Sequence, residues 1–514
     1  MKYFITLTLS LCLLVNNTTF ASHPAKFDQV DDKKKYKQYR EEGDKHYEQG
    51  DMVKAKKAYK LALDNKPGDK YATKKLEECT AYIDNEFSRL IKEADAAYES
   101  QNLVLAQQKY QQALTFKEGH SHAKMRLQQC KITPGSTFEQ QYGGRSFDEA
   151  KAVIKTKSGG YLVAGRSASA SGNTDMNLLK LDDKGSLIWD EKYGDRESEE
   201  AFDILETKDG GFIAVGYSDS YGSGPDIKDM WVVKVNAQGK QEWQKTFGTD
   251  TSIDEAKSIV EAHNGGYLIV GTTLDLSAEV PASDILVLKI DESGNKQWDK
   301  KYGGRSNEQG NDVVKTTDGY TIVGNTETYG KGKWDIWLLN IDEKGNKRWD
   351  NTFGGGDNEM GNSLLLTENG NYIIAGYTYS FAVSSLDAWV VKANSKGDQI
   401  WAKAFGGVST DEAFQVIPTK DGNYAFAGYT EEWIDDGEGG NASKKGHNIY
   451  LVKINPKGDR IWERSLGSEK EQRGFALVEA NDGGFVIAGY TKSIAKKGVD
   501  MYIIKTSASG LLAP

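Results

Sequence analysis

Acidic residues recur at two fixed places along most of the chain, and such spacing could support metal chemistry. Hard cations such as Ca²⁺ prefer several carboxylate oxygens, so a ring of calcium sites is one interpretation. Carboxylates also accept hydrogen bonds from the N–H groups of Gly-rich loops, and we favour this structural role. The first set is Asp175, Asp229, Asp284, Asp335, Asp387 and Asp500, with Asn448 in the remaining repeat. The second set is Asp148, Glu199, Asp254, Glu308, Glu359 and Asp411, with Gln472 last.

The sequence offers no residues that stand out as catalytic. Carboxylate pairs are generated by the repeat itself, so no single pair is marked as acid and base. His120 and His122 are close in sequence, but no Cys or carboxylate stands at a standard ligand spacing from them, which favours a surface loop. We therefore expect no catalytic residue, no enzyme activity, no metal site and no cofactor, with calcium left open.

A tryptophan also recurs once per repeat, on the fourth strand-like segment. Aromatic stacking on a ligand is one possible role. A large flat side chain at a fixed place instead suggests a wedge between packed sheets, burying about 200 Å². The set is Trp189, Trp243, Trp298, Trp349, Trp401 and Trp462, with Phe138 standing in once.

These residues are positioned by a repeat of about 54 residues that runs from residue 135 to the end. Each unit carries four strand signals separated by Gly-rich turns, and an aromatic residue followed by glycine marks its end. Counting these marks gives seven units, which predicts an all-β, seven-bladed β-propeller over 135–514. The last unit stops after its third strand, so a strand at 137–142 is expected to complete it and close the ring.

The repeat resembles the Gly-Gly-Tyr and Asp-x-Trp repeats of exported bacterial propellers. Tyr302-Gly303-Gly304 and the segment from Asp229 to Trp231 show the two motifs. The resemblance covers about 380 residues, and it implies a fold without implying a substrate.

Residues 36–131 have a different, helical period and are rich in Lys, Glu, Ala and Gln. Small residues would let two helices approach closely, an aromatic residue would fill their groove, and a proline would end the second helix. The positions are Gly43, Ala55, Tyr59, Ala62 and Pro67, and the pattern recurs about 51 residues later as Ala94, Ala106, Tyr110 and Ala113.

This helical pattern resembles the tetratricopeptide repeat, with departures at Glu42, His46 and Glu118. The resemblance implies an α-helical solenoid whose concave surface binds peptide or protein partners. Cys79 and Cys130 each close a third helix of the repeating unit. We expect two buried thiols, with a single disulfide bridge as the alternative. The fold class is therefore α + β and multidomain.

The N-terminus predicts export. Lys2, an apolar stretch and Thr19-Phe20-Ala21 are typical of a signal peptide over 1–21, followed by a linker over 22–35. Leu11 stands where a lipobox requires a small residue, which argues against lipidation of Cys12. No later apolar run is long enough to span a bilayer. We expect a periplasmic, outer-membrane-associated or extracellular protein.

The formal charge of −10, from 65 Lys and Arg against 75 Asp and Glu, argues against nucleic-acid binding. Ligand or partner contacts are expected on the face that carries the long, variable loops. The most specific candidate is a long insertion between Glu431 and His447, which could contact a partner or calcium. The candidate binding residues are Tyr221, Trp334, Tyr379, Phe381, Trp433, Asp435 and Asp436.

Together these features favour a non-catalytic, exported interaction scaffold of the bacterial cell envelope. The tetratricopeptide-like repeats would bind one protein partner and the propeller face another, in outer-membrane assembly or secretion. The alternative is a carbohydrate-binding or carbohydrate-active propeller. Acidic and aromatic residues gathered around one pocket would favour that alternative.

Overall fold

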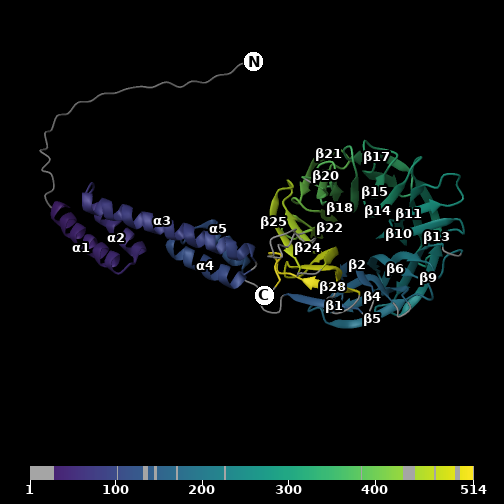
Figure 1. Cartoon of the computed structure of the whole chain (residues 1–514), viewed down its shortest axis with the longest axis horizontal. Helices are drawn as coiled ribbons and strands as arrows, with labels where there is room; N and C mark the ends of the chain where they lie inside the picture. Colours follow the sequence, from purple (N-terminus) through teal and green to yellow (C-terminus); the bar gives the residue numbers. More distant parts are fainter. Residues whose placement is uncertain are drawn as a thin grey trace, which may run out of the picture. The chain divides into compact units, whose positions relative to one another are not determined.

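A computed structural model of the chain describes residues 28–512, except residues 101, 131–136, 144–146, 169–171, 225–226, 384, 432–445, 468–470 and 493–497. The expected signal peptide at 1–21 and the loop residues Trp433, Asp435 and Asp436 lie outside the described residues. The chain divides into two compact units, Met1–Lys131 and Ile132–Pro514, and each is described by itself (Figure 1).

The first unit contains five helices in its described residues. They are α1 (Asp28–Glu48), α2 (Met52–Asn65), α3 (Lys70–Glu99), α4 (Leu103–Phe116) and α5 (Ser121–Gln129). Helices α1 and α2 pack together, as do α3 and α4.

Two features of these helices differ from the sequence prediction. Helix α1 begins at Asp28, inside the expected linker. Residues 70–99 form one continuous helix, so Cys79 lies within α3 and does not close a separate helix. No Gly or Pro interrupts this stretch, so nothing in its sequence ends the helix earlier.

The two helical hairpins repeat the same polar contact. Asp44 accepts hydrogen bonds from the hydroxyls of Tyr59 (2.7 Å) and Tyr71 (2.8 Å). The equivalent Asp95 accepts from Tyr110 and lies 2.9 Å from Nε2 of His122. Each carboxylate thus ties the helices of its own hairpin to the helix that follows. The thiols of Cys79 and Cys130 are free and buried.

The second unit consists of seven four-stranded antiparallel sheets, which we name blades A to G. Blade A contains β2 (Asp148–Lys155), β3 (Tyr161–Ala168), β4 (Thr174–Leu181) and β5 (Leu187–Tyr193), and blade B contains β6 (Glu199–Glu206), β7 (Phe212–Ser218), β8 (Asp229–Val235) and β9 (Gln241–Phe247). Blade C contains β10 (Ser252–Glu261), β11 (Tyr267–Asp275), β12 (Ser283–Ile290) and β13 (Lys296–Tyr302), and blade D contains β14 (Glu308–Lys315), β15 (Gly319–Thr326), β16 (Asp335–Asp342) and β17 (Lys347–Phe353).

Blades E to G continue the same order. Blade E contains β18 (Glu359–Leu366), β19 (Tyr372–Thr378), β20 (Asp387–Ala393) and β21 (Gln399–Phe405), and blade F contains β22 (Asp411–Pro418), β23 (Tyr424–Glu431), β24 (His447–Ile454) and β25 (Arg460–Leu466). Blade G contains β26 (Gln472–Glu479), β27 (Phe485–Lys492), β28 (Val499–Lys505) and, from the other end of the propeller, β1 (Phe138–Tyr142).

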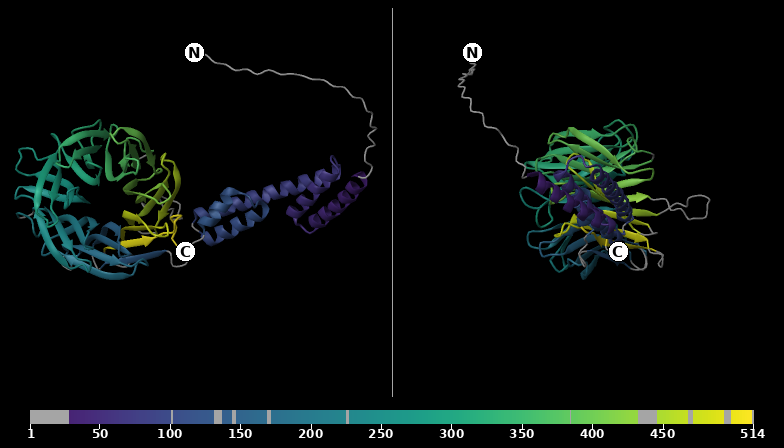
Figure 2. Two further views of the ribbon diagram at one scale, coloured as in Figure 1. Left: turned by 180° about the vertical axis from the view of Figure 1, so that it is seen from behind. Right: turned by 90° about the vertical axis from the view of Figure 1, so that its left-hand side faces the viewer.

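The blades form a closed ring, seen from behind in Figure 2. The first strands of successive blades contact one another and make its innermost layer. Strand β1 pairs antiparallel with β28, with Phe138 opposite Lys505 and Tyr142 opposite Met501. The predicted seven-bladed β-propeller is therefore confirmed.

Seven hydrophobic clusters fill the spaces between neighbouring blades, and the recurring aromatic residue packs against each cluster. Each aromatic ring also lies against a positive-φ glycine in a turn of the next blade. The pairs are Phe138 with Gly185, Trp189 with Gly239, Trp243 with Gly294, Trp298 with Gly345, Trp349 with Gly397, Trp401 with Gly458 and Trp462 with Gly510.

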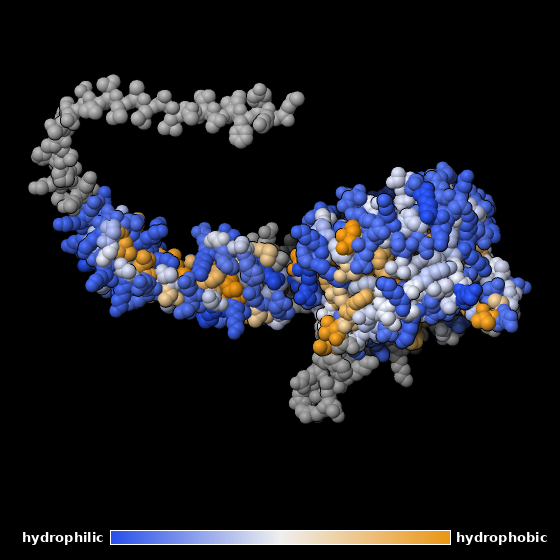
Figure 3. Space-filling model, turned by 90° about the horizontal axis from the view of Figure 1, so that it is seen from above, coloured by the Kyte–Doolittle hydropathy of each residue, from blue (hydrophilic) through white to orange (hydrophobic). Residues whose placement is uncertain are grey.

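The outer surface is mostly hydrophilic, with separate apolar patches on each unit (Figure 3). Among the described residues, no helix is both long and apolar enough to cross a membrane.

Candidate functional site

All seven first strands carry a β-bulge at the same position. The residue before each bulge is Ala or Gly, as at Ala150 in β2 and Gly310 in β14. The bulged residue is unpaired and is a Lys, a Phe or an Asn, depending on the blade. The bulged residues are Lys151, Phe202, Lys257, Asn311, Asn362, Phe414 and Phe475.

These seven side chains line a hollow of about 170 Å³ that is shared by all seven blades. Bulges commonly turn a side chain toward a functional site. Seven bulges that turn side chains from all seven blades into one hollow identify the inner channel as the candidate binding site. None of these seven residues is among the candidates predicted from the sequence. The sequence signal for them is an Ala or Gly followed by Lys, Phe or Asn at the same place in every first strand.

Ion pairs occupy the side of the channel formed by blades A and B. Nζ of Lys151 lies 2.9 Å from Glu149, and Arg166 binds the same carboxylate at 2.9 Å. Arg166 also lies 3.5 Å from Glu200 of blade B. Burial raises the pKa of Glu149, but Lys151 and Arg166 lower it by more, so its pKa lies below the usual value. Glu149 therefore stays ionised.

Blades B and C repeat this arrangement. Glu255 lies 2.9 Å from Lys257 and 3.4 Å from Lys228. The ammonium of Lys257 lies 3.6 Å from the ring centre of Phe202, and that of Lys151 lies 4.1 Å from the ring centre of Phe475. An ammonium group over an aromatic ring is attracted to the face of that ring, so each of these lysines and its phenylalanine stabilise one another.

Blades F and G form an aromatic wall. Phe414 and Phe475 make an edge-to-face contact at 4.8 Å, and Phe475 lies 5.8 Å from Tyr490. Phe414 also lies 5.9 Å from Tyr429, whose ring is covered by the guanidinium of Arg473 at 4.3 Å. Such a wall offers flat apolar faces beside polar groups.

One carboxyl group in this region differs from the others. Glu412 accepts a hydrogen bond from Nδ2 of Asn362 at 3.0 Å. Burial raises the pKa of Glu412 to about 7, and the nearby guanidinium of Arg473 only partly opposes this. Glu412 can therefore gain or lose a proton near neutral pH.

Several buried polar atoms near the channel have no hydrogen-bond partner within the described part of the chain. They are Nε of Arg166, Oε1 of Glu200, Nδ2 of Asn325 and Nε of Arg473. Buried polar atoms are nearly always paired with protein or water. These atoms are the ones that a polar ligand or ordered water would satisfy.

Residues next to the bulges connect neighbouring blades. Oδ2 of Asp203 accepts the N–H of Ile259 at 2.9 Å, and Asp312 accepts that of Leu364 at 2.7 Å. The hydroxyl of Ser258 donates to Asp312 at 2.9 Å and lies 3.2 Å from Asp203. These contacts hold the inner strands in place. Burial raises the pKa of Asp203 to about 7.

The loop aromatics chosen from the sequence do not gather in one place. Tyr221 packs on Trp231 at 5.5 Å, and Phe381 stacks on Trp389 at 5.3 Å, each within its own blade. Tyr379 is 46% exposed, and Phe381 is 52% exposed. The carbonyl of Trp334 accepts the N–H of Glu359 at 2.7 Å.

The recurring acids lie at the junctions between blades. Glu359 accepts the hydroxyl of Thr378 (2.7 Å) and the N–H groups of Ser380 (2.9 Å) and Gly355 (2.6 Å). Oδ2 of Asp335 accepts the N–H of Gly332 at 3.0 Å. These bonds hold the loops. Among the described residues, no group of three or more His, Cys, Asp or Glu side chains could hold a metal.

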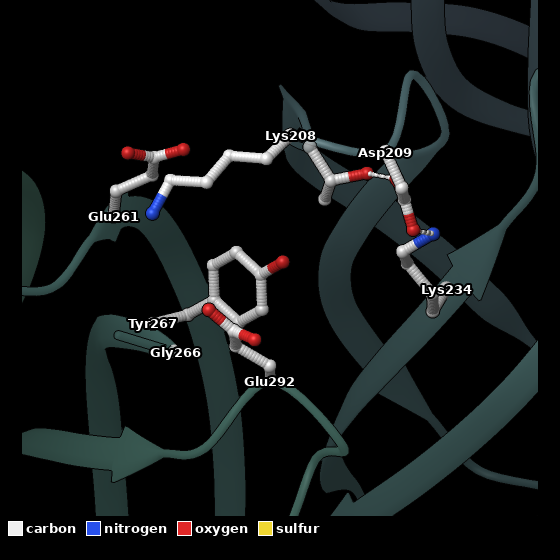
Figure 4. A pocket seen from close by; sticks show the side chains of 8 residues that line it. Lys208, Asp209, Lys234, Glu261, Gly266, Tyr267 and Glu292 are labelled. Atoms are coloured by element: carbon white, nitrogen blue, oxygen red, sulfur yellow. Dashed lines mark hydrogen bonds and ion pairs between the residues drawn. The ribbon is translucent and has the colours of Figure 1, made fainter. Parts of the chain in front are cut away.

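A second hollow, of about 160 Å³, lies near the short turns of blades B and C (Figure 4). The ring of Tyr267 lies in it between the carboxylates of Glu261 and Glu292, and the side chain of Lys208 extends toward Glu261. Asp209 lies 3.0 Å from Nζ of Lys234. This pair fixes the turn between β6 and β7.

Comparisons with known proteins leave the family open. No family model matches the chain. A regulatory protein, FlaEY of Caulobacter vibrioides, is 30% identical over 115 residues, which are 20% of this chain and 12% of that protein. The chain therefore spans about an eighth of that relative.

Several solved structures are similar at low identity. The propeller domain of the Trilobed protease from Pyrococcus furiosus is 10% identical, with a TM-score of 0.39 over 74% of this chain and 97% of that one. Sqt1 from Chaetomium thermophilum is 10% identical, with a TM-score of 0.40 over 72% of this chain and 100% of that one. A putative exo-β-1,3-galactanase from Bifidobacterium bifidum is 13% identical, with a TM-score of 0.32 over 52% and 91% of the two chains. At these values the similarities carry no argument about activity.

Proposed function

We propose that this chain is an exported, non-catalytic interaction protein of the cell envelope, with a glycan bound in the propeller channel and a protein partner bound by the helices. The observation that carries the proposal is the set of seven bulges. Each bulge turns a Lys, Phe or Asn side chain into one shared hollow. The proposal thereby joins the scaffold and carbohydrate hypotheses drawn from the sequence.

The chemistry of the channel suits a carbohydrate. Sugar rings present C–H faces that pack on aromatic side chains, and their hydroxyls both donate and accept hydrogen bonds. The channel supplies Phe414 and Phe475 for the first role. For the second it supplies the side-chain oxygens of Asn311 and Asn362 as acceptors, because their Nδ2 groups already donate to the carbonyls of Gly361 (2.8 Å) and Ala413 (2.9 Å). The carboxylates and cations of blades A to C are paired with one another, which favours a neutral ligand over a strongly charged one.

The helical unit supplies the proposed protein contact. Its two hairpins repeat one packing pattern, as in tetratricopeptide-like solenoids that bind peptides. Tyr71 and Tyr82 on α3 are 47% and 45% exposed, and Met125 on α5 is 50% exposed. Exposed apolar side chains mark a docking surface where they form one contiguous patch. The signal-peptide pattern supports export, with the periplasm or outer membrane as the site of action.

A glycan array followed by calorimetry tests the channel. We expect an oligosaccharide to bind the wild-type protein and Phe414→Ala or Phe475→Ala to weaken binding at least tenfold. Ile400→Ala is the matched control, because Ile400 lies on the outer strand β21 and is 51% exposed. If Tyr379→Ala and Phe381→Ala weaken binding while the channel variants do not, the ligand binds the loop face instead.

Affinity capture from envelope extract tests the helical unit. We expect specific proteins to be retained by the full mature chain and lost from residues 132–514. Retention of the same proteins by residues 132–514 would place the contact on the propeller. Absence of any retained protein would remove the scaffold part of the proposal.

Glu412 supports a second candidate, a carbohydrate-cleaving propeller. General acids in glycoside cleavage need a raised pKa, and burial gives Glu412 this property. Glu412→Gln separates the two functions. Loss of reducing-end release with unchanged ligand binding would indicate an enzyme. If the wild-type protein binds the glycan and releases no reducing ends from it, the chain is a binding protein.

A further inference from the structure

The junction between blades B and C differs from its neighbours. At other junctions a hydroxyl of the second strand donates to the acid that opens the first strand. Ser218 donates to Glu199 at 2.8 Å, and Thr326 donates to Glu308 at 2.8 Å. The equivalent Thr273 is 2% exposed, and its hydroxyl has no hydrogen-bond partner in the described part of the chain. Asp254 accepts instead from Ser252 at 2.5 Å.

An unpaired carboxylate oxygen lies at the same junction. Oδ2 of Asp229 accepts the hydroxyl of Ser223 at 2.6 Å, whereas its buried Oδ1 has no partner among the described residues. Asp229 and Asp254 approach Gly248 together. A Cβ at Gly248 would stand 2.1 Å from Oδ1 of Asp229 and 2.9 Å from Oδ2 of Asp254. Two carboxylates therefore converge, and Thr273 lies opposite Asp254 in the pairing of β10 with β11.

The junction also has room for a ligand. A hollow of about 500 Å³ is lined by Asp229, Ser252, Asp254 and Thr273, together with other residues of blades B and C. Burial raises the pKa of Asp229, and the neighbouring charge of Asp254 raises it further. Of the lysines in the hollow, Lys296 is already paired with Asp299 at 3.1 Å. Lys301 also lines the hollow, but the only charge that shifts the pKa of Asp229 is that of Asp254.

We propose that Asp229, Asp254 and Thr273 bind one Ca²⁺ ion at the junction of blades B and C. Calcium takes six to eight oxygen ligands in flexible geometry and accepts carboxylates, neutral oxygens and water together. Water completes the shell in the hollow. The ion satisfies the unpaired oxygens of Asp229 and Thr273, neutralises the acid pair and joins β8 of blade B to β10 and β11 of blade C.

Two other junctions provide natural comparisons. The junction of blades F and G carries amides, Asn448 and Gln472, in place of both acids. At the junction of blades D and E, Asp335 also has an unpaired Oδ1, but Thr378 is bonded to Glu359 at 2.7 Å. Asp335→Asn is therefore the matched control for Asp229→Asn.

Calorimetry with CaCl2 and Tb³⁺ luminescence on the chelator-treated full chain test the site. We expect one Ca²⁺ per chain, binding at least tenfold weaker in Asp229→Asn, severalfold weaker in Thr273→Val and unchanged in Asp335→Asn. Calcium should raise the Tm of wild type and not that of Asp229→Asn, with circular dichroism confirming that each variant is folded.

Three results would overturn the proposal. The first is a folded wild-type protein that gives neither binding heat nor Tb³⁺ signal. The second is equal weakening of Ca²⁺ binding by Asp335→Asn and Asp229→Asn. The acid pairs of both junctions would then bind calcium, and the unpaired hydroxyl of Thr273 would not distinguish the junction of blades B and C. The third is unchanged binding in Asp229→Asn and Thr273→Val, which would place the ion elsewhere.

Discussion

Gly397 of blade E lies directly beneath the indole ring of Trp349 of blade D. A Cβ at Gly397 would stand 2.5 Å from Cζ3 of Trp349. The glycine has a φ of +85°, a conformation that other residues adopt only with strain. Backbone geometry and the neighbouring ring thus both require glycine here, and the same relationship recurs around the ring.

Replacing Gly397 by Ala should destabilise the propeller through both effects. We expect the free energy of unfolding to fall by about 2–4 kcal/mol, combining left-handed strain with overpacking against the indole. Gly422→Ala is the control, because Gly422 has a φ of +77° and nothing within 4 Å of the added Cβ. Its cost should be about 1–2 kcal/mol in the same urea titration. Equal losses in both variants would mean that the indole contact is not tight.

Strand β1 should be necessary for a stable ring. It covers β28, the third strand of the last blade, which would otherwise be an exposed edge prone to aggregation. Residues 132–514 keep β1, and residues 143–514 lack it. We expect the first fragment to be monodisperse in size-exclusion chromatography and the second to aggregate or melt at lower temperature. A monodisperse second fragment with unchanged Tm would show that closure by β1 contributes little.

The repeat explains why so much of the propeller could be predicted. Each blade repeats one pattern, and an aromatic residue followed by glycine marks its end at Tyr302 and Phe353. An error of a few residues in the predicted strand boundaries does not change the number of these aromatic–glycine pairs, and so does not change the number of blades. The helices were harder to delimit, because helical periodicity continues through residues 70–99 without any residue that ends a helix.

The inner channel could not be found in the same way. Loop aromatics such as Phe381 are visible in the sequence, but their stacking on Trp389 is a three-dimensional contact. Conversely, Phe414 looks like an ordinary strand residue until the bulge between Ala413 and Gln415 turns it toward the axis. A bulge shifts strand register and leaves no clear mark in hydrophobic periodicity.

Gly43 should be needed for close packing of the first helical hairpin. A Cβ at Gly43 would stand 2.7 Å from the ring of Tyr59. We expect Gly43→Ala to lower the stability of α1 and α2 by about 1–3 kcal/mol, reduced by the better helix propensity of Ala. Hydrogen exchange of the amides in α1 and α2 measures this within the full chain. Gly119→Ala, with nothing within 4 Å of its added Cβ, should leave the exchange unchanged.

Asp203 should make the propeller less stable as the pH rises toward neutral. Burial raises its pKa to about 7 in the folded protein, against about 3.9 when unfolded. The folded state therefore holds this proton more tightly. The resulting stabilisation is complete below about pH 4 and is lost as the pH rises through about 7. Glu412, whose pKa is also about 7, acts in the same direction.

Asp203→Asn isolates this contribution, because an amide oxygen can still accept the N–H of Ile259 but has no proton to lose. Between pH 5 and 7, wild-type stability should fall by up to about 1.4 kcal/mol per pH unit for each such proton. Urea titrations across this range should show a shallower decline in Asp203→Asn. Asp250→Asn, at an exposed position, should keep the wild-type slope. An unchanged slope in Asp203→Asn would mean that Asp203 is ionised throughout this range.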